Sequence, residues 1–211
     1  MSTETRERTS RRLCRTVSEI HGHGWCLGTS GNFSVTLGRR PLEILITRSG
    51  RDKRRLTPAD LVTVDGDGRP VDDDEARPSA ETLLHCILAR HGAGSTLHTH
   101  SVAGTLLGRH FVADGGFTLE GYEMLKGLAG VETHAARIFV PVVANTQDMQ
   151  HLGSQVAELL ADRPTLHGFL IAGHGLYTWG DSLTTAQRHV EIFEFLLECV
   201  ARRTGFDPPG P

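Results

Sequence analysis

The chain has 211 residues, of which 38% are hydrophobic and 22% are charged, and its formal net charge is −3. This balance is typical of a globular protein with one sizeable core, and it excludes a strong overall attraction to nucleic acid or anionic membranes. No apolar stretch approaches the roughly 18 residues of a membrane span, and the polar segment 1–12 does not resemble a secretory signal. The four cysteines are scattered without a C-x-x-C pair, so we expect reduced thiols and a cytoplasmic protein.

Apolar residues at helical spacing predict five helices, some of them with recognisable caps. In chain order the predicted helices cover residues 5–23, 79–90, 101–108, 148–160 and 182–203. A glycine-rich stretch ends the first helix, and Ser79 and Ser101 are the expected N-caps of the second and third. Pro58 predicts a single helical turn before residue 61, and residues 121–126 are expected as a short helix or loop.

Short alternating or apolar runs predict seven strands. They cover residues 33–37, 42–47, 61–64, 93–100, 138–143, 169–172 and 176–180. Strands that alternate with helices predict one layered α/β domain over residues 1–204. Residues 72–75 are expected as a solvated acidic loop, and residues 205–211 as a disordered tail rich in proline and glycine.

Two histidines alternate with a threonine on the predicted strand 93–100. Because strand side chains alternate between faces, His98 and His100 point the same way, and two imidazoles on one face are placed to share a metal ion. Zinc binds nitrogen ligands and needs a third and often a fourth partner. The alternative interpretation is a buried histidine pair with satisfied hydrogen bonds, and His-x-His also arises by chance among twelve histidines.

His174 is the candidate for the third ligand. It lies between Gly173 and Gly175 directly after a buried strand, where the backbone can turn sharply and carry an imidazole into a cavity. With His98 and His100 it would form a three-histidine site with an open position, which is typical of catalytic zinc. The alternative is an ordinary histidine in a turn.

Several motifs in the same order resemble the class II aldolase/adducin family over about residues 11–203. They are Thr29-Ser30-Gly31-Asn32, Thr47-Arg48-Ser49-Gly50, Arg77-Pro78-Ser79-Ala80-Glu81, the His-Thr-His pair and Gly173-His174-Gly175. The resemblance implies a central, mainly antiparallel sheet flanked by helices. It also implies one Zn²⁺ per subunit held by His98, His100 and His174, and a homotetramer with active sites near subunit contacts.

Within that family the chain is most similar to the dehydratases that act on 5-methylthioribulose 1-phosphate in methionine salvage. The stretches that carry this likeness are 49–53, 121–124, 145–148 and 173–180. The resemblance implies a lyase that removes water and forms 2,3-diketo-5-methylthiopentyl 1-phosphate. The remaining alternatives are an aldolase or 4-epimerase acting on another ketose phosphate, and a non-catalytic binding module of the adducin kind.

A ketose 1-phosphate substrate implies a phosphate site built from small, donor-rich turns. Backbone amides, hydroxyl groups and positive charge bind phosphate where they converge on one point. The expected phosphate-binding residues are Ser30, Gly31, Asn32, Ser49, Gly50, Lys53 and Ser79. The alternative for each of these loops, taken singly, is an ordinary polar turn without a bound ligand. Ala80 stands where aldolase relatives often carry a second serine, which disfavours the aldolase alternative.

Dehydration needs a group that removes the C3 proton and a group that protonates the departing C4 hydroxyl. The resemblance implies Glu123 as the acid/base of the dehydratases and Glu81 as the residue at the position of the aldolase base. Glu81 could also bind the metal, or simply be a first-turn glutamate favoured by the helix dipole. We also expect Cys26 near the phosphate loop, and His189 and Glu191 at the surface or at a subunit contact.

Overall fold

Eight strands form a single sheet in the order β3-β2-β1-β4-β8-β7-β6-β5. The structure is a computed structural model, and it describes residues 3–71, 73 and 75–206. The strands are β1 (Asn32–Arg39), β2 (Leu42–Thr47), β3 (Leu61–Asp65), β4 (Ser95–Thr99), β5 (Gly116–Leu119), β6 (Ile138–Val143), β7 (Gly168–Ile171) and β8 (Gly175–Gly180). Neighbouring strands are antiparallel except for β6 and β7, so the expected mainly antiparallel sheet is confirmed.

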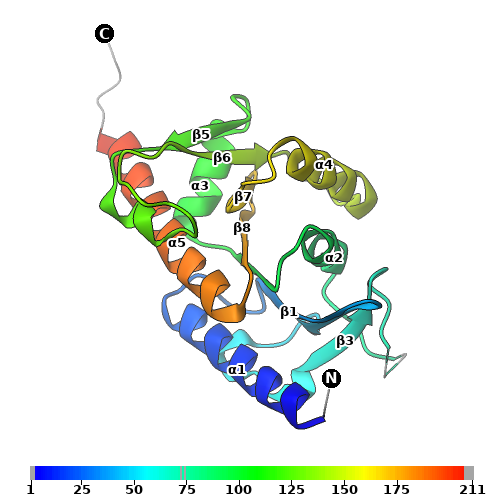
Figure 1. The fold of residues 1–211 in the computed structure, drawn as a ribbon. Coiled ribbons are helices and arrows are strands. Elements are labelled where there is room, and N and C mark those ends of the chain that lie inside the picture. Colours follow the sequence, from blue (N-terminus) through cyan, green and yellow to red (C-terminus); the bar gives the residue numbers. More distant parts are fainter. Residues whose placement is uncertain (1–2, 72, 74, 207–211) are drawn as a thin grey trace.

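Helices cover both faces of the sheet (Figure 1). They are α1 (Thr3–Gly22), α2 (Thr82–Arg90), α3 (Val102–Phe111), α4 (Met149–Asp162) and α5 (Leu183–Phe206), with 3-10 turns η1 (Lys53–Arg55), η2 (Pro58–Asp60) and η3 (Glu123–Gly127). The apolar sides of α1, α3 and α5 pack on one face, whereas those of α2 and α4 pack on the other. None of the described helices is both long and apolar enough to cross a membrane.

The caps follow the sequence except at the start of α2. Ser101 caps α3, and its hydroxyl accepts a hydrogen bond from the Gly104 amide, as the sequence predicts. Helix α2 begins later than expected, because residues 79–81 form a turn and Glu81 is the N-cap. That turn places Glu81 at the N-terminal end of α2, where its side chain contacts Asn32 of β1.

The structure differs from the sequence-based expectations in three further places. Strand β5 was not predicted, because it is short and begins at a glycine. The sequence predicts His189 at the surface or at a subunit contact, but it is buried inside the chain, with Nδ1 donating to the Trp179 carbonyl and Nε2 accepting from the Ala129 amide. Helix α5 continues through Gly205 to Phe206, so these two residues do not belong to a disordered tail. Residues 72 and 74 of the expected acidic loop and residues 207–211 of the expected tail lie outside the described residues.

The centre of the sheet sets the direction of the histidines. On β4, Leu97 packs into the core beneath α1, and the Thr99 hydroxyl donates to Glu194 of α5. The alternating residue His98 points the opposite way and stacks on the ring of Tyr177, which belongs to the core beneath α2 and α4. The strand period therefore sends His98 to the α2/α4 face of the sheet.

Candidate metal centre

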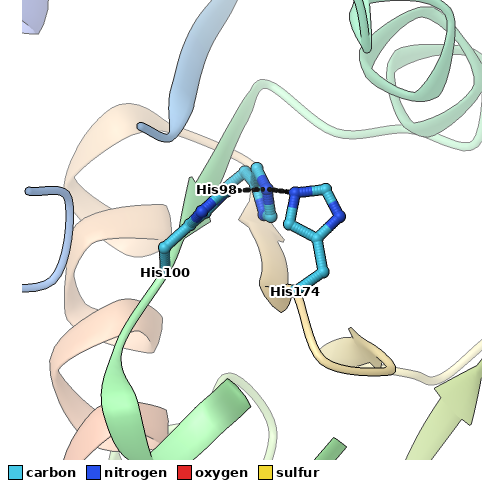
Figure 2. Close-up of side chains that lie close together, drawn as sticks. All are labelled: His98, His100 and His174. Carbon is cyan, nitrogen blue, oxygen red and sulfur yellow. Dashed lines mark hydrogen bonds between the residues drawn. The ribbon is translucent and has the colours of Figure 1, made fainter. Parts of the chain in front are cut away.

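Three imidazoles converge where β4 ends beside the β7–β8 turn (Figure 2). His98 lies in β4, His100 directly follows that strand, and His174 lies in the turn. Nε2 of His98 is 2.8 Å from Nε2 of His100 and 3.3 Å from Nε2 of His174. The potential ligand atoms of all three residues lie within 4.8 Å of one another. The structure therefore brings together the three histidines that the sequence predicts as ligands.

Two glycines allow His174 to reach this position. Gly173 has φ +64°, a left-handed backbone conformation that residues with a Cβ rarely adopt. A Cβ on Gly175 would lie 1.9 Å from the Thr99 carbonyl oxygen, so only glycine lets β8 approach β4 this closely. The close approach holds the turn, and with it His174, against the end of β4.

The protonation of the histidines suits metal binding. His98 Nδ1 donates to the Leu176 carbonyl at 2.8 Å, which leaves the Nε2 lone pair free on the side of the other two rings. Complete burial holds the pKa of His98 well below its ordinary value. Burial, with smaller contributions from His174 and Lys53, lowers the pKa of His100 to about 4. Neutral imidazole is the form that binds metal ions.

A carboxylate lies beside two of the three rings. Oε2 of Glu81 lies 3.4 Å from Nε2 of His98, and Oε1 lies 3.3 Å from Nε2 of His174. Oε2 also accepts hydrogen bonds from Asn32 Nδ2 at 2.6 Å and from the Tyr177 hydroxyl at 3.0 Å. Three imidazole nitrogens beside one carboxylate fit the ligand preferences of a divalent ion such as zinc.

A cleft of about 380 Å³ opens beside the three histidines and contains most of the expected phosphate-binding residues. Those that line it are Gly31, Asn32, Ser49, Gly50, Lys53 and Ser79. Ser30 is not among the lining residues. Glu81, His100 and His174 line the same cleft, so the predicted phosphate loops and the candidate metal centre share one space.

Lys53 joins two of these loops from a buried position. Its Nζ donates to the Thr29 carbonyl at 2.9 Å and to the Arg51 carbonyl at 3.0 Å. Because an ammonium group has three donors, one N–H remains for the cleft. Burial lowers the pKa of Lys53, while Cys26 and Asp52 oppose that shift. Cys26 lies next to Gly31 of the phosphate-type loop, as expected, but it packs into the core beneath α1 and is not among the described residues that line the cleft.

The other wall of the cleft is formed by residues that are not among the expected site residues, although the stretch 145–148 carries part of the resemblance to the dehydratases. It consists of the segment after β6, with Asn145, Thr146 and Gln147, together with Met149 at the start of α4. The available signal was a run of polar residues directly after a buried strand, a place where binding residues commonly lie. Tyr177 was missed because a tyrosine in an apolar strand resembles an ordinary core residue.

Glu123 occupies a different environment in the chain. It begins η3, its side chain is 72% exposed, and it is not among the described residues that line the cleft. Its carboxylate accepts a hydrogen bond from Lys126 at 2.5 Å and lies 3.7 Å from His134 Nδ1. Lys126 lowers the pKa of Glu123, with a smaller contribution from His134. Within one chain, Glu81 and not Glu123 lies beside the three histidines.

Residues 11–201 match the family model for the class II aldolase and adducin N-terminal domain. The chain is 47% identical over 187 residues to the methylthioribulose-1-phosphate dehydratase of Sorangium cellulosum, covering 88% of this chain and 87% of that protein. It is 50% identical over 189 residues to the protein of the same name from Stenotrophomonas maltophilia strain K279a, covering 89% and 87% of the two chains.

A solved structure has the same fold. The chain matches YgbL from Escherichia coli with a TM-score of 0.80 and 25% sequence identity. The match covers 98% of this chain and 94% of YgbL, so it includes the whole sheet and the helices on both faces.

Proposed function

The chain belongs to the class II aldolase and adducin family, and from that premise we propose that it is a zinc-dependent hydro-lyase that dehydrates 5-methylthioribulose 1-phosphate. The product is 2,3-diketo-5-methylthiopentyl 1-phosphate, and the reaction belongs to methionine salvage. The observation that carries the proposal is the meeting of three histidines, a carboxylate and the phosphate-type loops at one cleft. The names of relatives about half identical to the chain support the choice of substrate.

His98, His100 and His174 hold the metal ion in this proposal. A zinc ion there would supply Lewis acidity toward the ketone oxygen of the substrate. Burial keeps the His98 and His100 rings neutral and therefore able to bind the ion at neutral pH.

The loops around the cleft bind the phosphate. Ser49 and Gly50 follow β2, and Ser79 precedes α2, so hydroxyl and amide donors from separate segments face the same space. Lys53 adds a positive charge that is already fixed by two carbonyl groups. Binding energy gained at the phosphate orients the reacting carbons relative to the metal centre.

Glu81 transfers the proton at the metal centre. Oε2 is occupied by two donors, whereas Oε1 faces His174 and the cleft, so Oε1 takes the proton from C3. The C4 hydroxyl takes a proton from a general acid and leaves as water while a C3–C4 double bond forms, and the resulting enol then tautomerises to the diketone. The exposed position of Glu123 suits a second acid/base supplied to the cleft of a neighbouring copy in a homotetramer.

The four free cysteines suit a cytoplasmic enzyme.

The test is a substrate panel with product analysis. Metal-loaded protein is incubated with 5-methylthioribulose 1-phosphate and with other ketose 1-phosphates, and the products are identified by mass spectrometry. We expect loss of one water from the methylthio substrate. Glycolaldehyde-type fragments or an epimer without loss of water would replace the proposal with an aldolase or 4-epimerase, and protein purified without bound metal would favour a binding module.

A further inference from the structure

A line of buried polar side chains leads away from Glu81 into the interior. Asn32 and Ser34 are two residues apart on β1 and face the same side of the sheet. His85 lies four residues after Glu81 on the same side of α2. Asn32, Ser34 and His85 are buried, and His85 has no exposed surface. Such a group of polar side chains is stable only when each donor has an acceptor.

The contacts of Asn32 fix the direction of every hydrogen bond in this line. Its Nδ2 donates to Glu81 Oε2 at 2.6 Å, so its Oδ1 must be the atom that accepts from His85 Nε2 at 2.5 Å. His85 Nε2 therefore carries the proton. Burial lowers the pKa of His85 to about 3, which keeps the ring neutral and leaves Nδ1 as an acceptor. The Ser34 hydroxyl, 2.7 Å away, donates to Nδ1.

Tyr177 approaches Glu81 from β8. Its hydroxyl donates to Glu81 Oε2 at 3.0 Å, and its ring stacks on His98 with a centroid separation of 4.0 Å and an interplanar angle of 13°. Oε2 therefore has two donors, and Oε1 is the oxygen left toward His174.

We propose that Ser34, His85 and Asn32 are positioning residues whose hydrogen bonds, with that of Tyr177, hold Glu81 in one orientation with only Oε1 free to react. The inference rests on the proposed function, in which Glu81 transfers a proton. If His85 could not donate, the Asn32 carboxamide could turn over and place its oxygen against the carboxylate. The two oxygens would repel each other, and Glu81 would leave its reactive position.

The first test measures the proton on His85 and needs no substrate. Two-dimensional ¹⁵N–¹H spectra of histidine-labelled wild-type protein at neutral pH report which ring nitrogen carries hydrogen, and loss of the signal in His85→Gln assigns it. We expect a neutral ring with hydrogen on Nε2 only. Hydrogen on Nδ1, or a doubly protonated ring, would overturn the proposed hydrogen bonds from Ser34 through His85 to Asn32, whatever the substrate is.

The second test separates positioning from stability through three variants. His85→Leu removes the donor to Asn32, and we expect kcat to fall roughly 10–100-fold with KM and metal content nearly unchanged. His85→Gln can place an amide N–H where Nε2 was, and we expect it to restore kcat to within about threefold of wild type. Ser34→Ala removes the group that fixes the tautomer, and we expect a smaller fall in kcat.

A matched control removes another buried serine hydroxyl close by. Ser95 donates to the Ser34 carbonyl but does not touch His85 or Glu81, so Ser95→Ala should leave kcat at the wild-type value. Wild-type kcat in both His85→Leu and Ser34→Ala, or equal losses in His85→Leu and His85→Gln, would overturn the positioning role. A wild-type protein that shows the expected tautomer but does not dehydrate the substrate would overturn the proposed reaction instead.

Discussion

Oε1 of Glu81 lies 3.3 Å from Nε2 of His174, although the two residues are 93 positions apart in the sequence. The contact exists because α2 begins beside β1, which pairs with β4, and β4 pairs with β8 directly after the His174 turn. The contact brings the Glu81 carboxylate, which can transfer a proton, next to the histidines that can hold a metal ion.

Substitution of Glu81 should remove catalysis without removing the metal ligands. In Glu81→Gln the two donors to Oε2 lose a charged acceptor and Oε1 can no longer take a proton. We expect kcat to fall roughly 10²–10⁴-fold, the usual contribution of a general acid/base, while zinc content stays near that of the wild type. Steady-state kinetics and elemental analysis on the same preparation check both parts. Turnover close to wild type would exclude Glu81 as the base.

Substitution of His98 should remove both metal and activity. His98→Ala deletes the central ligand, whose Nε2 contacts the other two rings. We expect metal affinity to fall by more than about 100-fold, because even the loss of outer-shell partners costs about 10–100-fold. Elemental analysis after dialysis measures the loss, and His151→Ala, at an exposed histidine of α4, serves as the control. Full metal content in His98→Ala would contradict the proposed ligand set.

Glu123 should be needed in a neighbouring copy and not in its own chain. We expect Glu123→Gln to keep its zinc and lose turnover. Refolding it together with Glu81→Gln should then restore activity, since a site can combine Glu81 of one subunit with Glu123 of the next. Random pairing predicts about one quarter of wild-type activity. Activity in Glu123→Gln alone would exclude its role, and an inactive mixture that is shown to have exchanged subunits would exclude sharing.

Glu194 should make the free energy of unfolding depend on pH. It is buried on α5, its Oε1 accepts from Thr99 at 2.5 Å, and its Oε2 has no hydrogen-bond partner. Burial raises the pKa of Glu194 to about 7, the nearby Ser101 and Thr99 hydroxyls oppose the shift, and Glu198 adds a small effect. Between about pH 4.5 and 7 the folded chain keeps a proton that the unfolded chain has released, so stability falls as pH rises across this window.

The matching variant is Glu194→Gln, which cannot ionise. From pH 5 to pH 8 its free energy of unfolding should rise relative to the wild type by roughly 1–3 kcal/mol. Urea unfolding at both pH values of metal-free protein measures this difference. Glu198→Gln, at an exposed position one turn later on α5, should show a change within about 0.5 kcal/mol. Identical pH slopes for Glu194→Gln and wild type would mean that Glu194 is already ionised at pH 5.

Local sequence patterns determined the helices, most strands and the direction of the histidines. The strand alternation of β4, which ends one residue before His100, places His98 and His100 on one side, and Gly173 and Gly175 mark the turn that presents His174. These are properties of neighbouring residues, so they can be read without knowledge of the rest of the chain. The family motifs added the order of the elements and the mainly antiparallel sheet.

Only the tertiary structure decided which carboxylate lies beside the histidines. The sequence offers both Glu81 and Glu123, and their distances to His98 depend on how β1, β4 and β8 pair and on where α2 begins. The roles of His85 and Tyr177 follow from the same pairing, since each would be an ordinary buried residue without Asn32 and Glu81 beside it. Long-range strand pairing creates these contacts, and no local periodicity encodes them.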